Sequence, residues 1–123
     1  MFLVAGAVLG FLGVALGAFG AHALRATLSA ERQAIWQTAV QYHFHHALAL
    51  LATGLLIQHG GTGRAAWLAG WAFLGGTVLF SGSLYAVAFF GERRLGAITP
   101  VGGLLFLIGW AALAWAGWRL VSR

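Results

Sequence analysis

Residues 2–24 read FLVAGAVLGFLGVALGAFGAHAL, an apolar run that contains no ionisable side chain before His22. A helix needs about 20 mostly apolar residues to cross the hydrocarbon core of a bilayer, and this run has that length. A cleaved signal peptide is the competing interpretation, but such peptides begin with a positively charged segment and have an apolar stretch of only about 7–15 residues. The run therefore predicts a membrane-spanning helix over residues 2–24.

The composition of the whole chain agrees with a membrane protein. Of its 123 residues, 61% are hydrophobic and 7% are charged, and the mean hydropathy is +0.88. Soluble domains have roughly 45–50% apolar and 25% charged residues. This difference excludes a soluble enzyme, a disordered chain and a soluble nucleic-acid-binding protein. The lipid bilayer is thus an expected partner, and nucleic acid is not.

The basic residues are all arginines, and they are scattered beside the apolar runs rather than gathered in one cluster. They are Arg25, Arg32, Arg64, Arg93, Arg94, Arg119 and Arg123. This distribution is typical of the ends of membrane spans, where basic side chains meet anionic lipid. The chain contains no cysteine, which excludes disulfides and thiolate ligands.

A second span is predicted from a helix-start signal and a later apolar run. Ser29 followed by Glu31 is typical of a helix N-terminus, with a capping hydroxyl and an acid in the first turn. We therefore expect a helix that begins near residue 30, lies at the membrane interface at first, and crosses the bilayer over about residues 40–58.

The remaining apolar runs predict two more spans, over residues 65–90 and 100–120. The last one begins with Thr99 as the expected N-cap and Pro100 in the first turn. Because the connections are short, consecutive helices are expected to be antiparallel neighbours. The predicted fold is all-α: a single domain of residues 1–123 that forms a four-helix transmembrane bundle, with up-down topology and both termini on one side.

Glycines recur along the first predicted span at spacings of four, three, four and three. They are Gly6, Gly10, Gly13, Gly17 and Gly20. At roughly 100° per residue they share one face of a helix, and small residues at such spacings let two helices approach closely in lipid. We expect another helix to pack against this face, either from the same chain or from a second protomer.

Polar side chains collect in the halves of the predicted helices that lie opposite the termini. Those expected to line a pocket open to that membrane face are His22, Tyr42, His46, Ser81, Ser83, Tyr85 and Thr99. Polar residues at membrane depth usually face the interior of a bundle or a water-filled cavity. The alternative is that these groups simply form hydrogen bonds between helices.

The histidines are candidate ligands of a metal ion. His22, His43 and His46 could approach one ion, but no cysteine or carboxylate accompanies them. No metal or other cofactor is therefore expected, and a haem or copper centre held by two histidines remains as an alternative. The predicted spans contain no paired carboxylates, no nucleophile with its base and no phosphate-binding loop, so we expect a protein that is not an enzyme.

Four sets of residues occur together in a recognisable order. They are GAFGAH at 17–22, TAVQY at 38–42 leading to HALAL at 46–50, LFSGSLY at 79–85 and TPVGG at 99–103. In these motifs the chain resembles the small membrane-protein family called domain of unknown function 423, over nearly its whole length. The resemblance implies a multi-pass protein of the bacterial inner (plasma) membrane, and it implies no particular activity.

The resemblance bears on the candidate residues as well. All seven predicted pocket residues fall inside the motifs, whereas His43 and His45 lie outside them, which disfavours the three-histidine metal site. The main functional hypothesis is a non-enzymatic bundle whose pocket binds a small polar ligand, an ion or a lipid headgroup. The alternatives are a structural or assembly partner in a larger membrane complex, including a homo-oligomer, and a carrier of haem or copper held by two histidines.

Overall fold

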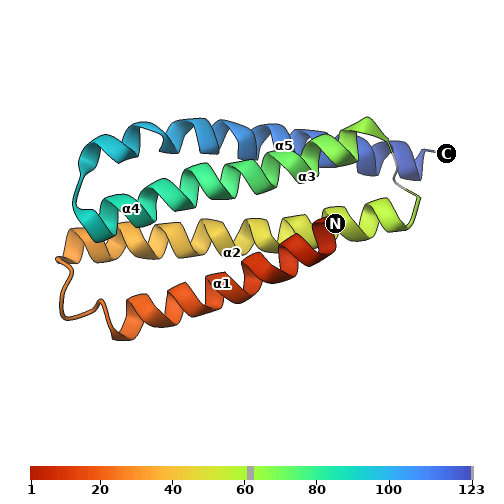
Figure 1. Ribbon diagram of the computed structural model, residues 1–123. Coiled ribbons are helices and arrows are strands. Elements are labelled where there is room, and N and C mark those ends of the chain that lie inside the picture. Colours follow the sequence, from red (N-terminus) through yellow and green to blue (C-terminus); the bar gives the residue numbers. More distant parts are fainter. Residues whose placement is uncertain (61–62, 123) are drawn as a thin grey trace.

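The computed structural model describes residues 1–60 and 63–122, and their secondary structure is entirely helical. The elements are α1 (Phe2–His22), α2 (Ala30–Gln58), α3 (Arg64–Gly76), the π-helical segment η1 (Thr77–Ser81), α4 (Gly82–Phe90), the 3₁₀ segment η2 (Arg93–Ala97) and α5 (Thr99–Val121). Figure 1 shows α3, η1 and α4 as one continuous rod, and it shows both termini toward the same end of the molecule.

Three segments of the described chain are long and apolar enough to cross a membrane. They are α1, the rod from Arg64 to Phe90, and the segment from Arg93 to Val121. The longest helix, α2, has 29 residues, but its N-terminal half carries many polar side chains, so its composition does not qualify it. By length and composition alone, the described residues therefore contain three spans rather than the predicted four.

Helix α1 packs on α2 through part of its glycine face. A Cβ atom on Gly6 would lie 2.9 Å from the Leu51 backbone nitrogen and 3.0 Å from the Ala47 carbonyl oxygen. Near the other end of α1, a Cβ on Gly20 would overlap the indole of Trp36. Since Gly6 pairs with later residues of α2 than Gly20 does, the two helices are antiparallel. The helix against the glycine face thus belongs to the same chain, although Gly10 meets nothing within 4 Å.

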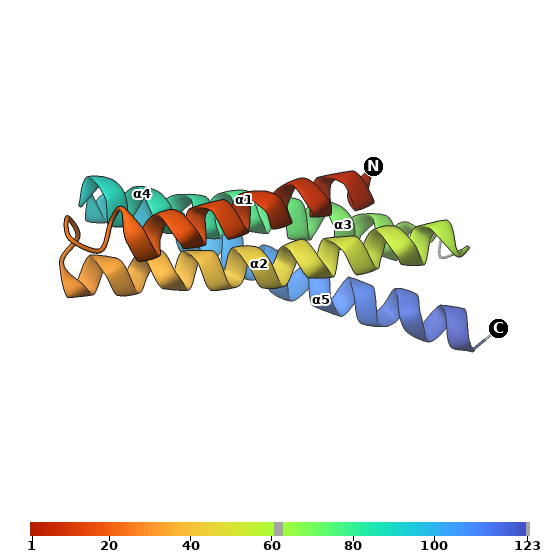
Figure 2. The same cartoon turned by 90° about the horizontal axis from the view of Figure 1, so that it is seen from below.

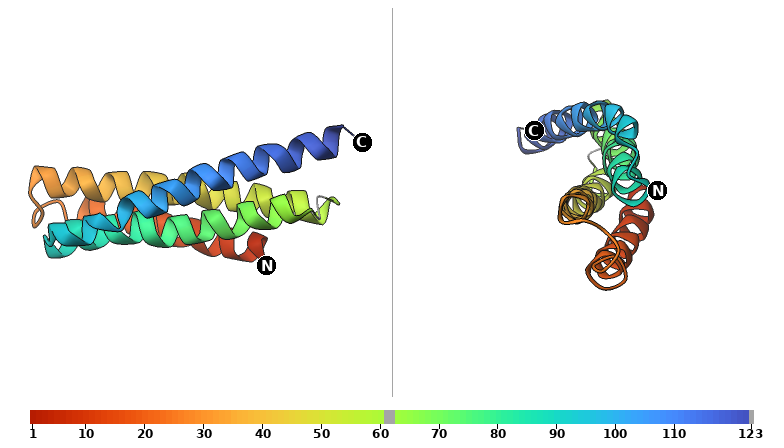
Figure 3. Two further views of the ribbon diagram at one scale, coloured as in Figure 1. Left: turned by 90° about the horizontal axis from the view of Figure 1, so that it is seen from above. Right: turned by 90° about the vertical axis from the view of Figure 1, so that its left-hand side faces the viewer.

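The main core lies where α2, α3 and α5 meet. It contains Leu50, Phe73 and Phe106, all buried, with Phe2 closing it from α1. In the end-on view of Figure 3, α1 and the α3–α4 rod lie on two adjacent sides of α2, while α5 lies beyond α3. Figure 2 shows that the C-terminal half of α5 diverges from the other helices. The side of α2 that faces away from α3 and α4 is thus left uncovered.

Two helix starts were predicted from local signals, and they differ in outcome. The Ser29 hydroxyl accepts a hydrogen bond from the Arg32 backbone N–H at 3.3 Å, so Ser29 is the N-cap of α2. Thr99 is not the N-cap of α5, because the helix already includes it and Ile98 precedes it. The Thr99 hydroxyl instead lies 2.6 Å from the Ser83 hydroxyl, which ties the start of α5 to α4.

The segment η1 is a feature that the sequence did not predict, since residues 65–90 were expected to form one regular helix. Its five residues form a π-helix, and Thr77 and Ser81 are buried. The Ser81 hydroxyl donates to the Ala39 carbonyl of α2 at 2.8 Å. Gly102 of α5 lies so close that a Cβ there would overlap the Phe80 backbone nitrogen. The segment η1 is therefore in close contact with both α2 and α5.

Candidate functional site

A groove of about 510 Å³ runs along the outside of the bundle between α2, η1 and α5. Its lining residues are mostly apolar or aromatic: Tyr42, His46, Phe80, Pro100, Gly103, Leu104, Phe106, Leu107 and Trp110. Near one end of the groove, α5 closely approaches η1 at Gly102. Only Tyr42 and His46 among the predicted pocket residues line this groove.

The ring of His46 forms part of the groove wall and is held from three sides. Its Nδ1 lies 2.7 Å from the Tyr42 carbonyl oxygen, which only accepts, so Nδ1 carries the hydrogen. The Trp110 indole N–H, which only donates, lies 3.1 Å from Nε2, so that nitrogen accepts. The imidazole also stacks on Phe106, with ring centroids 3.4 Å apart and 6° between the planes. These contacts fix one neutral tautomer of His46.

Tyr42 lies at the mouth of the groove. Its ring contacts Phe80, with centroids 4.6 Å apart, and its side chain is 40% exposed. Its hydroxyl makes no hydrogen bond with the part of the chain that the structure describes. A phenol both donates and accepts, so this hydroxyl is the polar group that a molecule in the groove could use.

Four of the other predicted pocket residues form contacts between helices outside the groove: Ser81, Ser83, Tyr85 and Thr99. The Tyr85 hydroxyl lies 2.9 Å from Nδ1 of His43, and Ser81 and Ser83 form the contacts with α2 and α5 described above. His22 is exposed at the end of α1. The structure thus brings Tyr42 and His46 together, and it places His22, Ser81, Ser83, Tyr85 and Thr99 outside the groove.

The described residues do not bring His22, His43 and His46 together around one ion. Nowhere in residues 1–60 and 63–122 do three His, Cys, Asp or Glu side chains gather around one point. His43 faces Tyr85 on α4, whereas His46 faces Phe106 and Trp110 on α5, so the two rings turn to different helices. Both nitrogens of His46 are already hydrogen-bonded, Nδ1 to the Tyr42 carbonyl and Nε2 to the Trp110 indole.

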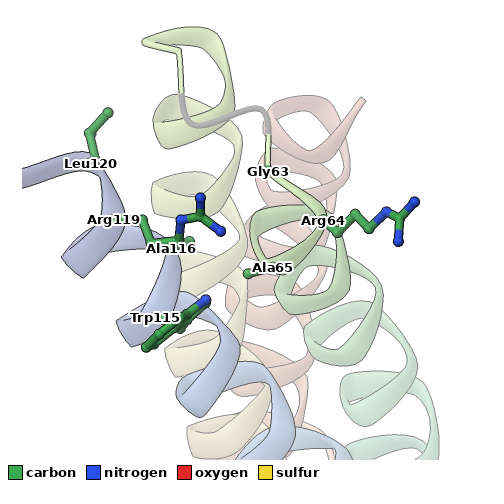
Figure 4. A pocket seen from close by; sticks show the side chains of 7 residues that line it. All are labelled: Gly63, Arg64, Ala65, Trp115, Ala116, Arg119 and Leu120. Atoms are coloured by element: carbon green, nitrogen blue, oxygen red, sulfur yellow. The ribbon is translucent and has the colours of Figure 1, made fainter. Parts of the chain in front are cut away.

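A second cavity, of about 270 Å³, lies at the other end of the molecule between the start of α3 and the end of α5. Figure 4 shows that Trp115 and Arg119 of α5 lie beside this gap and that Arg64 of α3 points away from them. An indole and a guanidinium at the end of an apolar helix are typical of a span that reaches the headgroup region. The sequence predicted this role for Arg119 but not the cavity.

Sequence reasoning missed the aromatic residues that complete the groove. Phe106 and Trp110 are four residues apart, and this spacing places them on one face of α5. That spacing was a usable signal for an aromatic wall. The spacing does not indicate which helix this aromatic face contacts, so its contact with His46 could not be predicted.

Comparison with known proteins agrees with the resemblance seen in the motifs. The family described as "Protein of unknown function (DUF423)" matches residues 16–103. No solved structure matches the chain.

Among the matching relatives, three illustrate the similarity over most of both chains. A UPF0382 membrane protein of Staphylococcus epidermidis is 46% identical over 92% of this chain and 91% of its own. The UPF0382 membrane protein YwdK of Bacillus subtilis is 43% identical over 89% of each chain. The UPF0382 inner membrane protein YgdD of Escherichia coli is 42% identical over 98% of this chain and 92% of its own. With the three apolar segments, these relatives confirm the predicted inner-membrane location, and the chain belongs to the DUF423 family of membrane proteins.

Proposed function

We propose that α2 is a fourth crossing, so that the chain forms an antiparallel four-helix transmembrane bundle. The support is the register between α1 and α2. Gly6 of α1 lies beside Leu51, and Gly20 lies beside Trp36, so residues 36–51 of α2 are level with the apolar run of α1. A helix that packs along the length of a membrane span lies at the same depth in the bilayer, whatever its own composition.

We propose further that the bundle is not an enzyme and that it binds a lipophilic small molecule in the groove between α2 and α5. The observation that carries this proposal is the Tyr42 hydroxyl, which has no hydrogen-bond partner among the described residues and lies at an aromatic groove of about 510 Å³. Leu104, Leu107 and Phe106 offer apolar surface for a hydrocarbon tail. Tyr42 offers one hydrogen bond to a polar head.

The state of His46 favours binding over catalysis. Its two nitrogens are engaged by Tyr42 and Trp110, so the ring has no free site for taking a proton from a ligand. Its stack on Phe106 makes a flat, rigid wall instead. The ligand class is therefore an amphipathic molecule with a flat head that forms hydrogen bonds and an apolar tail. This ligand class differs from the small polar ligand, ion or lipid headgroup expected from the sequence, because the groove is lined mostly by apolar and aromatic side chains.

The test is to purify the protein from membranes in mild detergent, extract it with organic solvent and identify the bound lipids by mass spectrometry. Leu104→Trp fills the groove, and Tyr42→Phe removes only the hydroxyl. Leu68→Trp is the matched control, because Leu68 is exposed on α3 outside the groove. We expect one compound near 1:1 with the unaltered protein and the control, and its loss from Leu104→Trp. The same lipids in equal amounts from all four proteins would contradict the proposal.

A subunit of a larger membrane assembly is the second candidate function. It is favoured by the exposed side of α2, where Gln41 and His45 project away from the core. Lipid cannot satisfy such side chains, so a protein surface that covers them would be stabilising. This role is compatible with the ligand groove, because the groove lies between α2 and α5, to one side of these residues.

A further inference from the structure

The uncovered side of α2 carries exposed residues at alternating spacings of three and four. They are Thr38, Gln41, His45, Leu48, Ala52 and Leu55. This repeat is the one that two helices need to pack side by side along their length with a small crossing angle. None of the six is an Asp, Glu, Lys or Arg, and the half toward residue 55 is apolar.

The depth of this face follows from the contacts between α1 and α2. A Cβ on Gly13 would lie 3.3 Å from the Phe44 ring, and one on Gly17 would lie 3.2 Å from Val40. Gln41 and His45 are therefore level with the stretch of α1 around Gly13 to Gly17. At about 1.5 Å per residue, this stretch lies roughly 8–14 Å inside the end of α1 at His22. If α1 spans the membrane, both side chains lie within the hydrocarbon region.

Exposure to lipid at that depth is unfavourable for a carboxamide and an imidazole. The Thr38 hydroxyl is satisfied within α2, since it donates to the Ala34 carbonyl at 3.1 Å. No such bond ties Gln41 or His45 to another residue that the structure describes. Polar side chains inside a membrane are nearly always paired with protein groups or face water. The face of α2 from Thr38 to Leu55 is therefore expected to be covered in the membrane.

We propose that a second copy of this chain covers it, with α2 packed parallel to α2 around a twofold axis along the membrane normal. All copies insert with the same orientation, so such an axis brings Gln41 opposite Gln41 and His45 opposite His45. A carboxamide and a neutral imidazole each hold a donor and an acceptor, so each can bond to its own copy. No Arg or Glu lies on the face to repel an identical one, and the apolar half from Leu48 onward matches itself equally well.

The proposal rests on the fourth crossing by α2 and is independent of the ligand groove.

The chain has no cysteine, so single cysteines can be introduced without background. Gln41→Cys and Leu48→Cys are oxidised in native membranes, with Val14→Cys as the matched control. Val14 is 62% exposed on α1 at a similar depth, on a helix that the proposal leaves facing lipid. We expect disulfide-linked dimers from the two α2 variants and monomer from the control.

Leu48→Cys keeps Gln41 in place, so the test does not depend on a variant that removes the polar contact. A second measurement adds Gln41→Leu, which is expected to weaken dimerisation in detergent about 3- to 30-fold, the range for interhelical hydrogen bonds in membranes. Monomer from both α2 variants, equal cross-linking of Val14→Cys, or a product of another mass would overturn the proposal.

Labelling of the His45→Cys variant distinguishes a failure of the dimer proposal from a failure of the proposal that α2 crosses the membrane. A membrane-impermeant maleimide is applied to right-side-out and inverted vesicles, and then to protein in detergent. If α2 crosses the bilayer, residue 45 is protected in both kinds of vesicle and reacts only after detergent has removed the lipid and dissociated the dimer. Labelling in intact vesicles of either orientation would refute the crossing itself, whereas protection from the maleimide without cross-links would refute the dimer alone.

Discussion

The imidazole of His46 lies flat on the phenyl ring of Phe106, with ring centroids 3.4 Å apart and 6° between the planes. Two hydrogen bonds in the plane of the imidazole, to the Tyr42 carbonyl and from the Trp110 indole, hold it in this position. α2 and α5 have few other contacts with each other. His46 is therefore the main link between the two walls of the groove.

The first prediction concerns the hydrogen bond between Trp110 and His46. We expect His46→Leu to lower the free energy of unfolding by about 1–3 kcal/mol, because the Trp110 indole N–H is left without its partner in a lipid environment. Combined with Trp110→Phe, the double-mutant cycle should give a coupling energy of about 0.6–1.7 kcal/mol. Unfolding by added SDS in mixed micelles measures both quantities.

His59→Leu is the control for that experiment. His59 is exposed at the end of α2, and its Nδ1 lies 2.9 Å from the Leu55 carbonyl of the same helix. Its replacement should leave the unfolding curve within about 0.5 kcal/mol of the original. Equal destabilisation by His46→Leu and His59→Leu would show that His46 does not link α2 to α5.

The second prediction compares two glycines of α1. Gly6→Ala should destabilise the protein by about 1–3 kcal/mol, because the added methyl meets the backbone of α2 at Leu51 and Ala47. Gly10→Ala should be neutral or stabilising by up to about 1 kcal/mol, since its methyl meets nothing within 4 Å and alanine favours the helix. SDS unfolding of the two variants distinguishes them, and an equal loss from both would be inconsistent with the described packing of α1.

The third prediction compares two arginines near the same end of the bundle. Arg32 donates from Nε to the Ala88 carbonyl at 2.6 Å and from a guanidinium nitrogen to the Phe89 carbonyl, so it caps the last turn of α4. Arg93 forms an ion pair with Glu31 at 3.3 Å, but both side chains are largely exposed.

Because charged hydrogen bonds to a helix C-terminus are stabilising, Arg32→Gln should lower the free energy of unfolding by about 1–2 kcal/mol. Arg93→Gln should change it by less than about 0.5 kcal/mol, since an exposed ion pair contributes little. Both variants lose one positive charge, so effects on membrane insertion are matched. Thermal unfolding in detergent checks the difference, and a larger effect from Arg93→Gln would count against the cap.

The fourth prediction uses neighbouring glycines at the start of α5. Gly102→Ala should push α5 away from η1, because its methyl would overlap the backbone nitrogen of Phe80. Gly103→Ala should be tolerated, since its nearest neighbour is the edge of the Phe80 ring at 3.8 Å. We expect a loss of about 1–3 kcal/mol for Gly102→Ala and less than about 1 kcal/mol for Gly103→Ala. Similar unfolding curves for the pair would contradict the close contact between α5 and η1.

The parts of the fold that depend on local sequence were predictable, and those that depend on distant partners were not. The capping role of Ser29 follows from its immediate neighbours, and the structure shows it. Thr99 carries an equally good capping signal, but the Ser83 hydroxyl, sixteen residues earlier, takes its hydrogen bond instead. In the same way, periodicity placed Gly10 with the other glycines of α1, although a Cβ atom there would meet nothing within 4 Å.

The candidate site shows the same limit. The sequence identified Tyr42 and His46 as polar groups at membrane depth, and both line the groove. It could not reveal that His43 turns toward Tyr85 while His46 turns toward Trp110. Helical spacing tells which residues share a face of one helix, but it carries no information about which helix that face meets.

The π-helical segment η1 makes the number of residues in this rod as important as their identity. Before it, α3 packs mainly against α5, and after it, α4 packs mainly against α2. A π turn accommodates one more residue than an α turn, so closing it into a regular α-helix with the same number of residues would rotate everything downstream by about 100°. Tyr85 would then swing away from His43. A residue inserted within residues 77–81 should therefore rotate α4 away from α2, whereas a one-residue deletion that removes the π turn should keep α4 in its orientation.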